Sequence, residues 1–151
     1  MKGYDIMNEN EELLEYIYKT SNMGYQSTQD LIDAIKNKDN KIKQLLPEIA
    51  KNYEKYAKES EKLLKKQKLE AKPLGTMAKT MSKFSINKEM LSDNSDAKIA
   101  DMLIQGLTMG NLELTKNIDN YEKTADKKIL ALAKDLKEFG ENYIQKLKSY
   151  L

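Results

Sequence analysis

The 151-residue chain contains no cysteine, histidine, tryptophan, arginine or valine. Without cysteine it has no disulfide, thiolate nucleophile or zinc ribbon, and without histidine it has no Ser-His-Asp triad, histidine metal ligand or histidine pH switch. The lack of arginine removes the side chain whose planar head grips phosphate or guanine with two hydrogen bonds. These absences exclude most familiar catalytic sites, so the sequence predicts an architecture and points to no reaction.

The charges are almost balanced, with 26 lysines against 24 aspartates and glutamates and a formal net charge of +2. A balanced chain has no overall attraction to nucleic acid, and we expect no nucleic-acid partner. No apolar run approaches the roughly 18 residues that a membrane-spanning helix needs, so we expect no membrane span. Residues 1–10 are polar and lack the apolar region of a secretion signal, which predicts a cytoplasmic location.

Apolar residues recur at intervals of three and four along almost the whole chain, which is the spacing of one face of a helix. Strands are not expected, because valine is absent, aromatic residues make up only 7% of the chain and no segment alternates with period two. The pattern predicts a single all-α domain over residues 1–151. Its helices are expected over residues 8–37, 41–69, 76–88, 96–121 and 125–150.

Pro47 interrupts the second of these helical patterns. Proline lacks a backbone N–H and clashes with the preceding turn, so it bends a helix that continues through it, yet it fits well in a first turn. Because the apolar phase is kept from Ile42 to Leu63, we expect a kinked helix over residues 41–69. The alternative is a helix that starts near Leu46 with Pro47 in its first turn.

Two connections between the long helices are tight, whereas residues 71–95 form a long crossover that holds the short helix. Short links join antiparallel neighbours, and a crossover of about 25 residues can run the length of a bundle. The sequence therefore predicts an antiparallel four-helix bundle made of two helical hairpins. An internal repeat agrees with this, because Met23-Gly24 and Ile32-Asp33 recur 86 residues later as Met109-Gly110 and Ile118-Asp119.

Two hairpins joined by a long crossover resemble the ferritin-like superfamily, and the resemblance covers residues 10–150. Diiron members of that superfamily place a Glu on the first and third helices and Glu-x-x-His on the second and fourth. In this chain the matching positions hold Thr20, Tyr53, Tyr56, Gly106, Gly140 and Tyr143. None is a carboxylate or an imidazole, so the resemblance implies the fold without ferroxidase, oxidase or iron-storage activity, and we expect no cofactor.

A second resemblance concerns the third long helix. The stretch Ile99–Gly106, followed by Met109-Gly110, is similar to small helical proteins of low-GC Gram-positive bacteria. This resemblance implies no particular activity.

Three tyrosines, Tyr53, Tyr56 and Tyr143, are expected to converge near the middle of the bundle, opposite a set of small residues. In the structural interpretation the rings fill the volume of a metal site, and their hydroxyls bond to Thr20, Ser21 or Gln105 because buried phenols need partners. The alternative is a small pocket for an apolar or aromatic ligand. The residues assigned to that candidate pocket are Tyr53, Tyr56, Tyr143, Thr20, Gly24 and Gly110.

A further alternative is a metal site made of oxygen ligands alone, which would suit Mg, Ca or Mn rather than iron. Such a site would have to recruit Glu54, Asp101, Glu113 or Glu141. The helical phase places these four residues on flanking or surface positions, which counts against the site.

Four glycines lie inside helical patterns, at positions 24, 106, 110 and 140. Each costs up to about 1 kcal/mol of helix stability relative to alanine. Close approach of two helices, or space for an aromatic ring, is expected to offset that cost at each position.

The crossover helix is the predicted partner surface. Met77, Met81 and Phe84 mark its apolar side, and lysines mark the other side. In the structural interpretation the apolar side caps the bundle. The alternative is that it binds the groove of a partner protein.

Taken as a whole, the sequence favours a non-enzymatic, ferritin-like bundle. We expect it to act as a structural or protein-interaction module and to form a homodimer. Two alternatives stay open. One is a small-ligand or metal-binding protein descended from a diiron carboxylate enzyme, and the second is a helical export or assembly chaperone.

Overall fold

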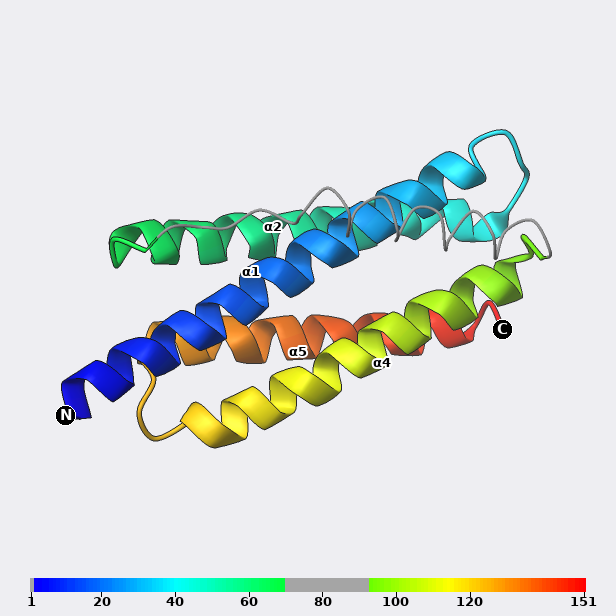
Figure 1. Ribbon diagram of the computed structural model, residues 1–151. Coiled ribbons are helices and arrows are strands. Elements are labelled where there is room, and N and C mark those ends of the chain that lie inside the picture. Colours follow the sequence, from blue (N-terminus) through cyan, green and yellow to red (C-terminus); the bar gives the residue numbers. More distant parts are fainter. Residues whose placement is uncertain (1, 70–92) are drawn as a thin grey trace.

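The computed structural model describes the backbone of residues 2–69 and 93–151, with side chains from residue 9 onward. Every regular element within these residues is helical (Figure 1). The elements are α1 (Lys2–Ala34), the short 3-10 helix η1 (Lys41–Gln44), α2 (Leu46–Lys66), α4 (Asp96–Tyr121) and α5 (Lys127–Lys148). The prediction of an all-α chain with four long helices is therefore confirmed for the described residues.

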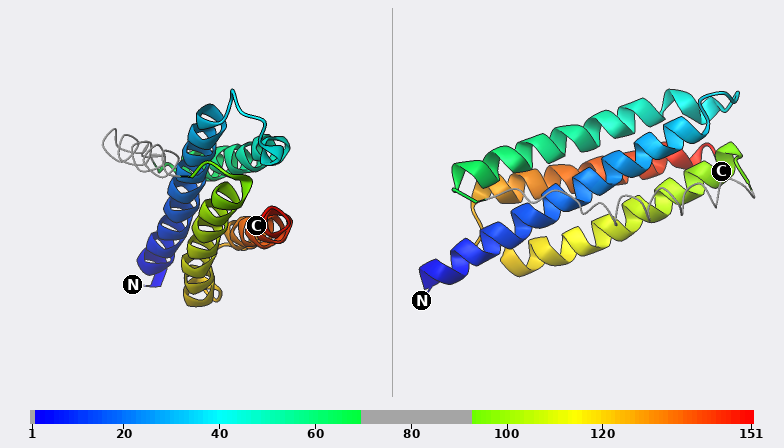
Figure 2. Two further views of the ribbon diagram at one scale, coloured as in Figure 1. Left: turned by 90° about the vertical axis from the view of Figure 1, so that its right-hand side faces the viewer. Right: turned by 45° about the horizontal axis from the view of Figure 1, so that its top comes forward.

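The four long helices are arranged as two antiparallel hairpins, α1 with α2 and α4 with α5 (Figure 1). Seen end-on, α1 and α4 lie on one side of the molecule, and α2 and α5 lie on the opposite side (Figure 2). The helices pack more densely within each hairpin than α1 packs against α4. Between the two hairpins, α1 and α4 form the most extensive contact of the long helices.

Asp96, the first residue of α4, ties the two hairpins together at the end where α1 turns into α2. Its Oδ2 accepts a hydrogen bond from the backbone N–H of Lys41 at 3.1 Å. Its Oδ1 accepts from the side-chain amide of Asn40 at 3.0 Å. The helix itself begins here because the hydroxyl of Ser95 accepts from the N–H of Lys98 at 3.2 Å, which makes Ser95 the N-cap.

The predicted kink at Pro47 is wrong. Helix α2 begins at Leu46 with Pro47 in its first turn, and the residues before it form the separate helix η1. The missing N–H of Pro47 falls where a helix leaves its donors unpaired anyway. The apolar phase continues across this break because Ile42, in η1, is buried against the same core as Ile49.

The remaining predicted bounds differ at the ends. Helix α4 spans the predicted residues 96–121, whereas α1 begins before residue 8 and ends at Ala34, and α5 spans 127–148 instead of 125–150. The predicted crossover helix over residues 76–88 lies outside the described residues, and so do Met77, Met81 and Phe84.

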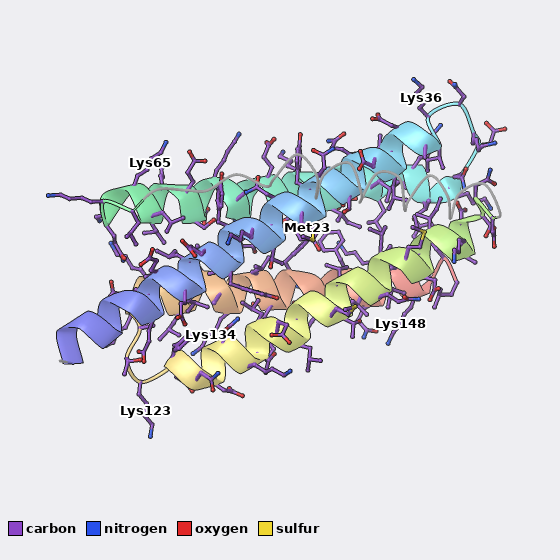
Figure 3. The ribbon with its side chains drawn as sticks, in the orientation of Figure 1. Met23, Lys36, Lys65, Lys123, Lys134 and Lys148 are labelled. Atoms are coloured by element: carbon purple, nitrogen blue, oxygen red, sulfur yellow. The ribbon has the colours of Figure 1, made fainter. Side chains whose placement is uncertain are left out.

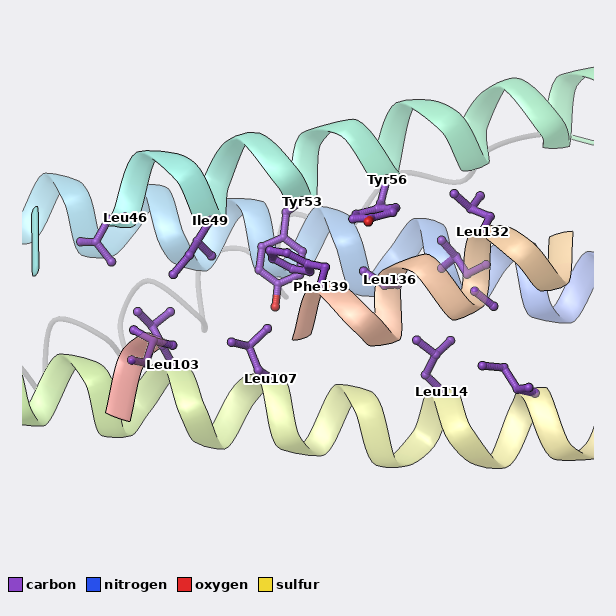
Figure 4. Packing of buried hydrophobic residues seen from close by; sticks show 14 of the residues in the cluster. Leu46, Ile49, Tyr53, Tyr56, Leu103, Leu107, Leu114, Leu132, Leu136 and Phe139 are labelled. Carbon is purple, nitrogen blue, oxygen red and sulfur yellow. The ribbon is translucent and has the colours of Figure 1, made fainter. Parts of the chain in front are cut away.

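A continuous hydrophobic core runs along the bundle between the helices (Figure 4). Its members follow the three-and-four spacing that predicted the helices. The largest fully buried side chains are Leu13, Leu14, Ile17, Leu31, Ile35, Ile42, Leu46, Ile49, Leu64, Ile99, Leu114 and Ile129. Burial of each such side chain contributes about 1.5 to 3 kcal/mol, and this core fixes the helix backbones that carry the candidate site.

Candidate binding groove between α1 and α4

The three predicted tyrosines do converge, but they converge around Phe139 of α5. The Phe139 ring lies 5.0 Å from the Tyr53 ring in an edge-to-face arrangement, 5.8 Å from Tyr56 and 5.1 Å from Tyr143, measured between centroids. Such aromatic pairs each add about 0.5 to 1.5 kcal/mol beyond the area that they bury. The cluster therefore joins α2 to α5 at the middle of the bundle.

The hydroxyls of Tyr56 and Tyr143 do not find the predicted partners. Tyr56 donates to the backbone carbonyl of Asp135 at 3.1 Å, and Tyr143 donates to Glu48 Oε1 at 3.1 Å. The expectation of bonds to Thr20, Ser21 or Gln105 is therefore wrong for both. The physical reason is that Tyr56 and Tyr143 point along the α2–α5 side, away from α1.

Tyr53 behaves differently from these two tyrosines. Its side chain reaches from α2 toward α4 (Figure 4), and only 8% of the residue is exposed. Burial raises the pKa of Tyr53 well above its usual value, so the phenol is a neutral O–H group at ordinary pH.

Gly24 of α1 is what allows Tyr53 to reach so far. A Cβ atom at position 24 would lie 2.4 Å from Cε1 and Cζ of the Tyr53 ring, a distance at which atoms clash. The ring therefore occupies the space of the missing side chain. The predicted role of a glycine as space for a ring holds at this position.

The remaining three glycines differ in how closely other residues approach them. At Gly140 a Cβ would lie 2.6 Å from the Asn111 side chain, which donates to the Lys137 carbonyl at 2.9 Å, so here too a neighbour fills the space. At Gly110 the nearest atom, Cγ2 of Thr20, is at an ordinary 3.7 Å. At Gly106 a Cβ would meet no atom of the described residues within 4 Å, so the expectation of a close approach is wrong there, because the position faces open space among those residues.

That open space belongs to a groove of about 510 Å³ between α1 and α4. The walls are mainly apolar, and Tyr53 lies at the floor. The apolar wall residues are Met23 and Leu31 from α1 with Met102, Leu103, Leu107 and Met109 from α4. Figure 3 shows Met23 on the side of α1 that faces α4.

Four of the six residues assigned to a candidate pocket line this groove, namely Tyr53, Thr20, Gly24 and Gly110. Tyr56 and Tyr143 do not line it, and their rings pack against Phe139 instead. The structure thus brings part of the predicted set together, between α1 and α4 instead of at the bundle centre.

Two methionines that flank the groove were not predicted as site residues from the sequence. Met23 is 50% exposed and Met109 is 71% exposed, which is unusual for large apolar side chains. The internal repeat could have identified them, because Met23-Gly24 and Met109-Gly110 are matching pairs of that repeat. Both copies lie on the same groove, one on each wall.

Polar side chains line one end of the groove, namely Tyr16, Thr20 and Glu113. Tyr16 donates to the Gly110 carbonyl at 2.8 Å and also bonds to Thr20. Burial raises the pKa of Tyr16, and the nearby carboxylate of Glu113 acts in the same direction. Thr20, predicted as a partner for the three central tyrosines, is thus bonded to Tyr16 instead.

The structure offers no group of three or more acidic residues that could hold a metal ion within the residues that it describes. Asp101, one of the carboxylates considered for an oxygen-only site, accepts from Gln105 at 3.0 Å. Glu54 and Glu113 pair with Lys58 and Lys116 on the surface, at 3.4 and 3.3 Å. The described helices also include none that is long and apolar enough to cross a membrane.

Comparisons with protein-family models, with curated proteins and with solved structures find no match for this chain.

Proposed function

We propose that this chain is a ferritin-like helical bundle that works as a non-enzymatic protein-interaction module, and that a helix of its partner binds in the groove between α1 and α4. The observation that carries the proposal is the pair of exposed methionines, Met23 and Met109, on the two walls of an apolar groove. Large apolar side chains exposed together mark interaction surfaces. Methionine suits such a surface because its flexible side chain adapts to the shape of a partner.

The shape of the groove favours a helix as occupant. Its lining residues run from Tyr16 to Leu31 on α1, a length of about 22 Å at 1.5 Å per residue. On α4 the lining includes Gly106, which has no side chain to keep a partner's backbone away. A partner helix of about three to four turns would fill this length and bury its apolar face.

A second candidate function is binding of a small apolar or aromatic molecule, and the Tyr53 hydroxyl favours it. A volume of about 510 Å³ lies in the usual range for small-molecule sites, which are apolar with a few polar groups that fix the ligand. The phenol of Tyr53, which lines the groove, would supply one such group. The two candidates differ in the length of groove that the ligand covers.

The chaperone and the metal-binding protein have less support. A chaperone that used Met77, Met81 and Phe84 depends on residues outside the described part of the chain. A metal-binding role would need ligands that the positions matching the diiron motif do not supply, since they hold threonine, glycine and tyrosine. The homodimer and the cytoplasmic location stay predictions.

The proposal is tested by blocking the groove. In Gly106→Leu the added Cβ meets no described atom within 4 Å, so we expect the fold to be kept while the larger side chain occupies the groove. The probe is a helical peptide of about 18 residues with one leucine face and an uncharged glutamine face. We expect the wild-type chain to bind it and Gly106→Leu to bind it at least about tenfold more weakly in fluorescence anisotropy.

Thr108→Leu is the matched control. It adds a leucine to an exposed position of the same helix that does not line the groove, so it should leave the affinity unchanged. The proposal would be contradicted if both variants weakened peptide binding equally, or if the wild-type chain did not bind the peptide. Binding of a small aromatic probe without the peptide would favour the second candidate.

A further inference from the structure

Charge is distributed unequally between the two sides of the bundle. From residue 9 onward α1 carries six carboxylates and one lysine, and α4 carries four carboxylates and two lysines, which gives this side a formal charge of −7. Helix α2 carries four carboxylates and six lysines, and α5 carries three carboxylates and six lysines, which gives the opposite side +5. The small net charge of the whole chain therefore conceals an acidic side, and the groove lies on it.

Glu113 is the one charged residue among the described residues that line the groove, and it lies at the same end as Tyr16. Farther along the same seam, Glu12 accepts a hydrogen bond from the hydroxyl of Tyr121, and Glu9 accepts one from the hydroxyl of Thr124. Over residues 9–20 and 113–121 there are six carboxylates and two lysines, so this end of the seam stays acidic.

The Tyr53 hydroxyl is a polar group that an occupant of the groove could meet. Only 8% of the residue is exposed, and Tyr53 lines the groove. A polar group of an occupant could form a hydrogen bond with this phenol, which can both donate and accept. Tyr53 and the carboxylate of Glu113 therefore both favour an occupant with polar or charged groups beside its apolar face.

We propose that the partner helix is cationic, with lysine or arginine side chains lying at the Tyr16 end of the groove and apolar side chains lying against the methionines. This deepens the proposed function and rests on it, because it names the chemistry of the helix that the groove takes. Opposite charges across an interface steer the two partners together and fix the orientation in which they bind. The acidic end of the groove thus sets the direction of the partner helix.

A second copy of this chain is a poorer occupant. Its own groove side carries the same charge of −7, so two copies that met face to face through α1 and α4 would repel each other. An acidic helix would meet the same repulsion. The cationic helix is the occupant that both the apolar walls of the groove and the acidic helices α1 and α4 favour.

The test uses three peptides of about 18 residues that share one leucine face and carry lysine, glutamine or glutamate on the polar face. We expect the lysine peptide to bind the wild-type chain about tenfold more tightly than the glutamine peptide at about 50 mM salt, and the glutamate peptide to bind most weakly. The differences should shrink at about 500 mM salt because the charges are screened.

Two charge-reversal variants locate the effect. Glu113→Lys removes the groove carboxylate, and Glu141→Lys on α5 is its matched control. Their side chains are 57% and 60% exposed, and each forms one surface ion pair, with Lys116 at 3.3 Å and with Lys137 at 4.0 Å. The net charge changes equally in both, so we expect about tenfold weaker binding of the lysine peptide only in Glu113→Lys.

The outcomes separate the two proposals. If the three peptides bind equally, or if Glu113→Lys and Glu141→Lys weaken binding equally, the cationic partner is wrong and the helix-binding groove stands. If no peptide binds, or if Gly106→Leu binds all three as wild type does, both proposals are wrong. If sedimentation shows a dimer that Gly106→Leu dissociates, the occupant is a second copy and the cationic partner is overturned.

Discussion

Replacing Phe139 by alanine is expected to lower the free energy of unfolding by about 3 to 5 kcal/mol. Phe139 is buried on α5, and its ring contacts Tyr53, Tyr56 and Tyr143. The substitution removes the apolar surface of a whole ring and leaves a cavity that the three tyrosines can fill only in part. A domain of this size is stable by about 5 to 15 kcal/mol, so the loss would be a large fraction of the total.

The measurement is urea unfolding followed by circular dichroism of the helices, with Phe139→Leu as the milder companion. Leucine keeps part of the buried volume, and its cost should be clearly smaller, about 1 to 2 kcal/mol. If alanine and leucine destabilise equally, or if alanine costs under about 1 kcal/mol, then Phe139 does not hold the two hairpins together as the structure indicates.

Alanine should have opposite effects at two glycines of the groove. At Gly24 the added Cβ would lie 2.4 Å from the Tyr53 ring, which cannot move freely because it packs edge-to-face on Phe139. Overpacking of this kind costs about 1 to 3 kcal/mol. At Gly106 the Cβ meets nothing within 4 Å, so only the helix preference for alanine remains, which stabilises by up to about 1 kcal/mol.

The pair Gly24→Ala and Gly106→Ala is a matched comparison, because both make the same chemical change inside a helix beside the same groove. Thermal unfolding should give a lower midpoint for Gly24→Ala and an equal or higher midpoint for Gly106→Ala. A double variant, Gly24→Ala with Tyr53→Leu, should recover part of the loss, since the clashing ring is gone. Two midpoints that fall equally would show that Tyr53 does not occupy the space beside Gly24.

Much of the fold was predictable because helical periodicity and capping are local. The spacing of apolar residues predicted four long helices, and α4 has the predicted bounds, with Ser95 as its N-cap. The kink at Pro47 was predicted wrongly because a buried Ile42 keeps the apolar phase whether or not the helix is continuous. The spacing of apolar residues alone does not distinguish one bent helix from two helical segments.

The groove was not predictable in the same way, because it depends on how far apart two helices lie. Gly24 and Gly106 look alike in the sequence, yet one faces a ring and the other faces open space. The sequence placed Tyr53, Thr20, Gly24 and Gly110 on inward positions and could not say which gap they would line. The spacing of apolar residues does not single out Phe139, although its ring packs against all three tyrosines.

The central claim, that a helix binds between α1 and α4, is tested most directly by NMR of the methionine methyl groups. The chain has eight methionines, and three of them, Met23, Met102 and Met109, line the groove. We expect addition of the uncharged helical peptide to shift the methyl signals of these three, with Gly106→Leu abolishing the shifts. Shifts confined to Met77, Met81 and Met90, or no shifts at saturating peptide, would contradict the claim.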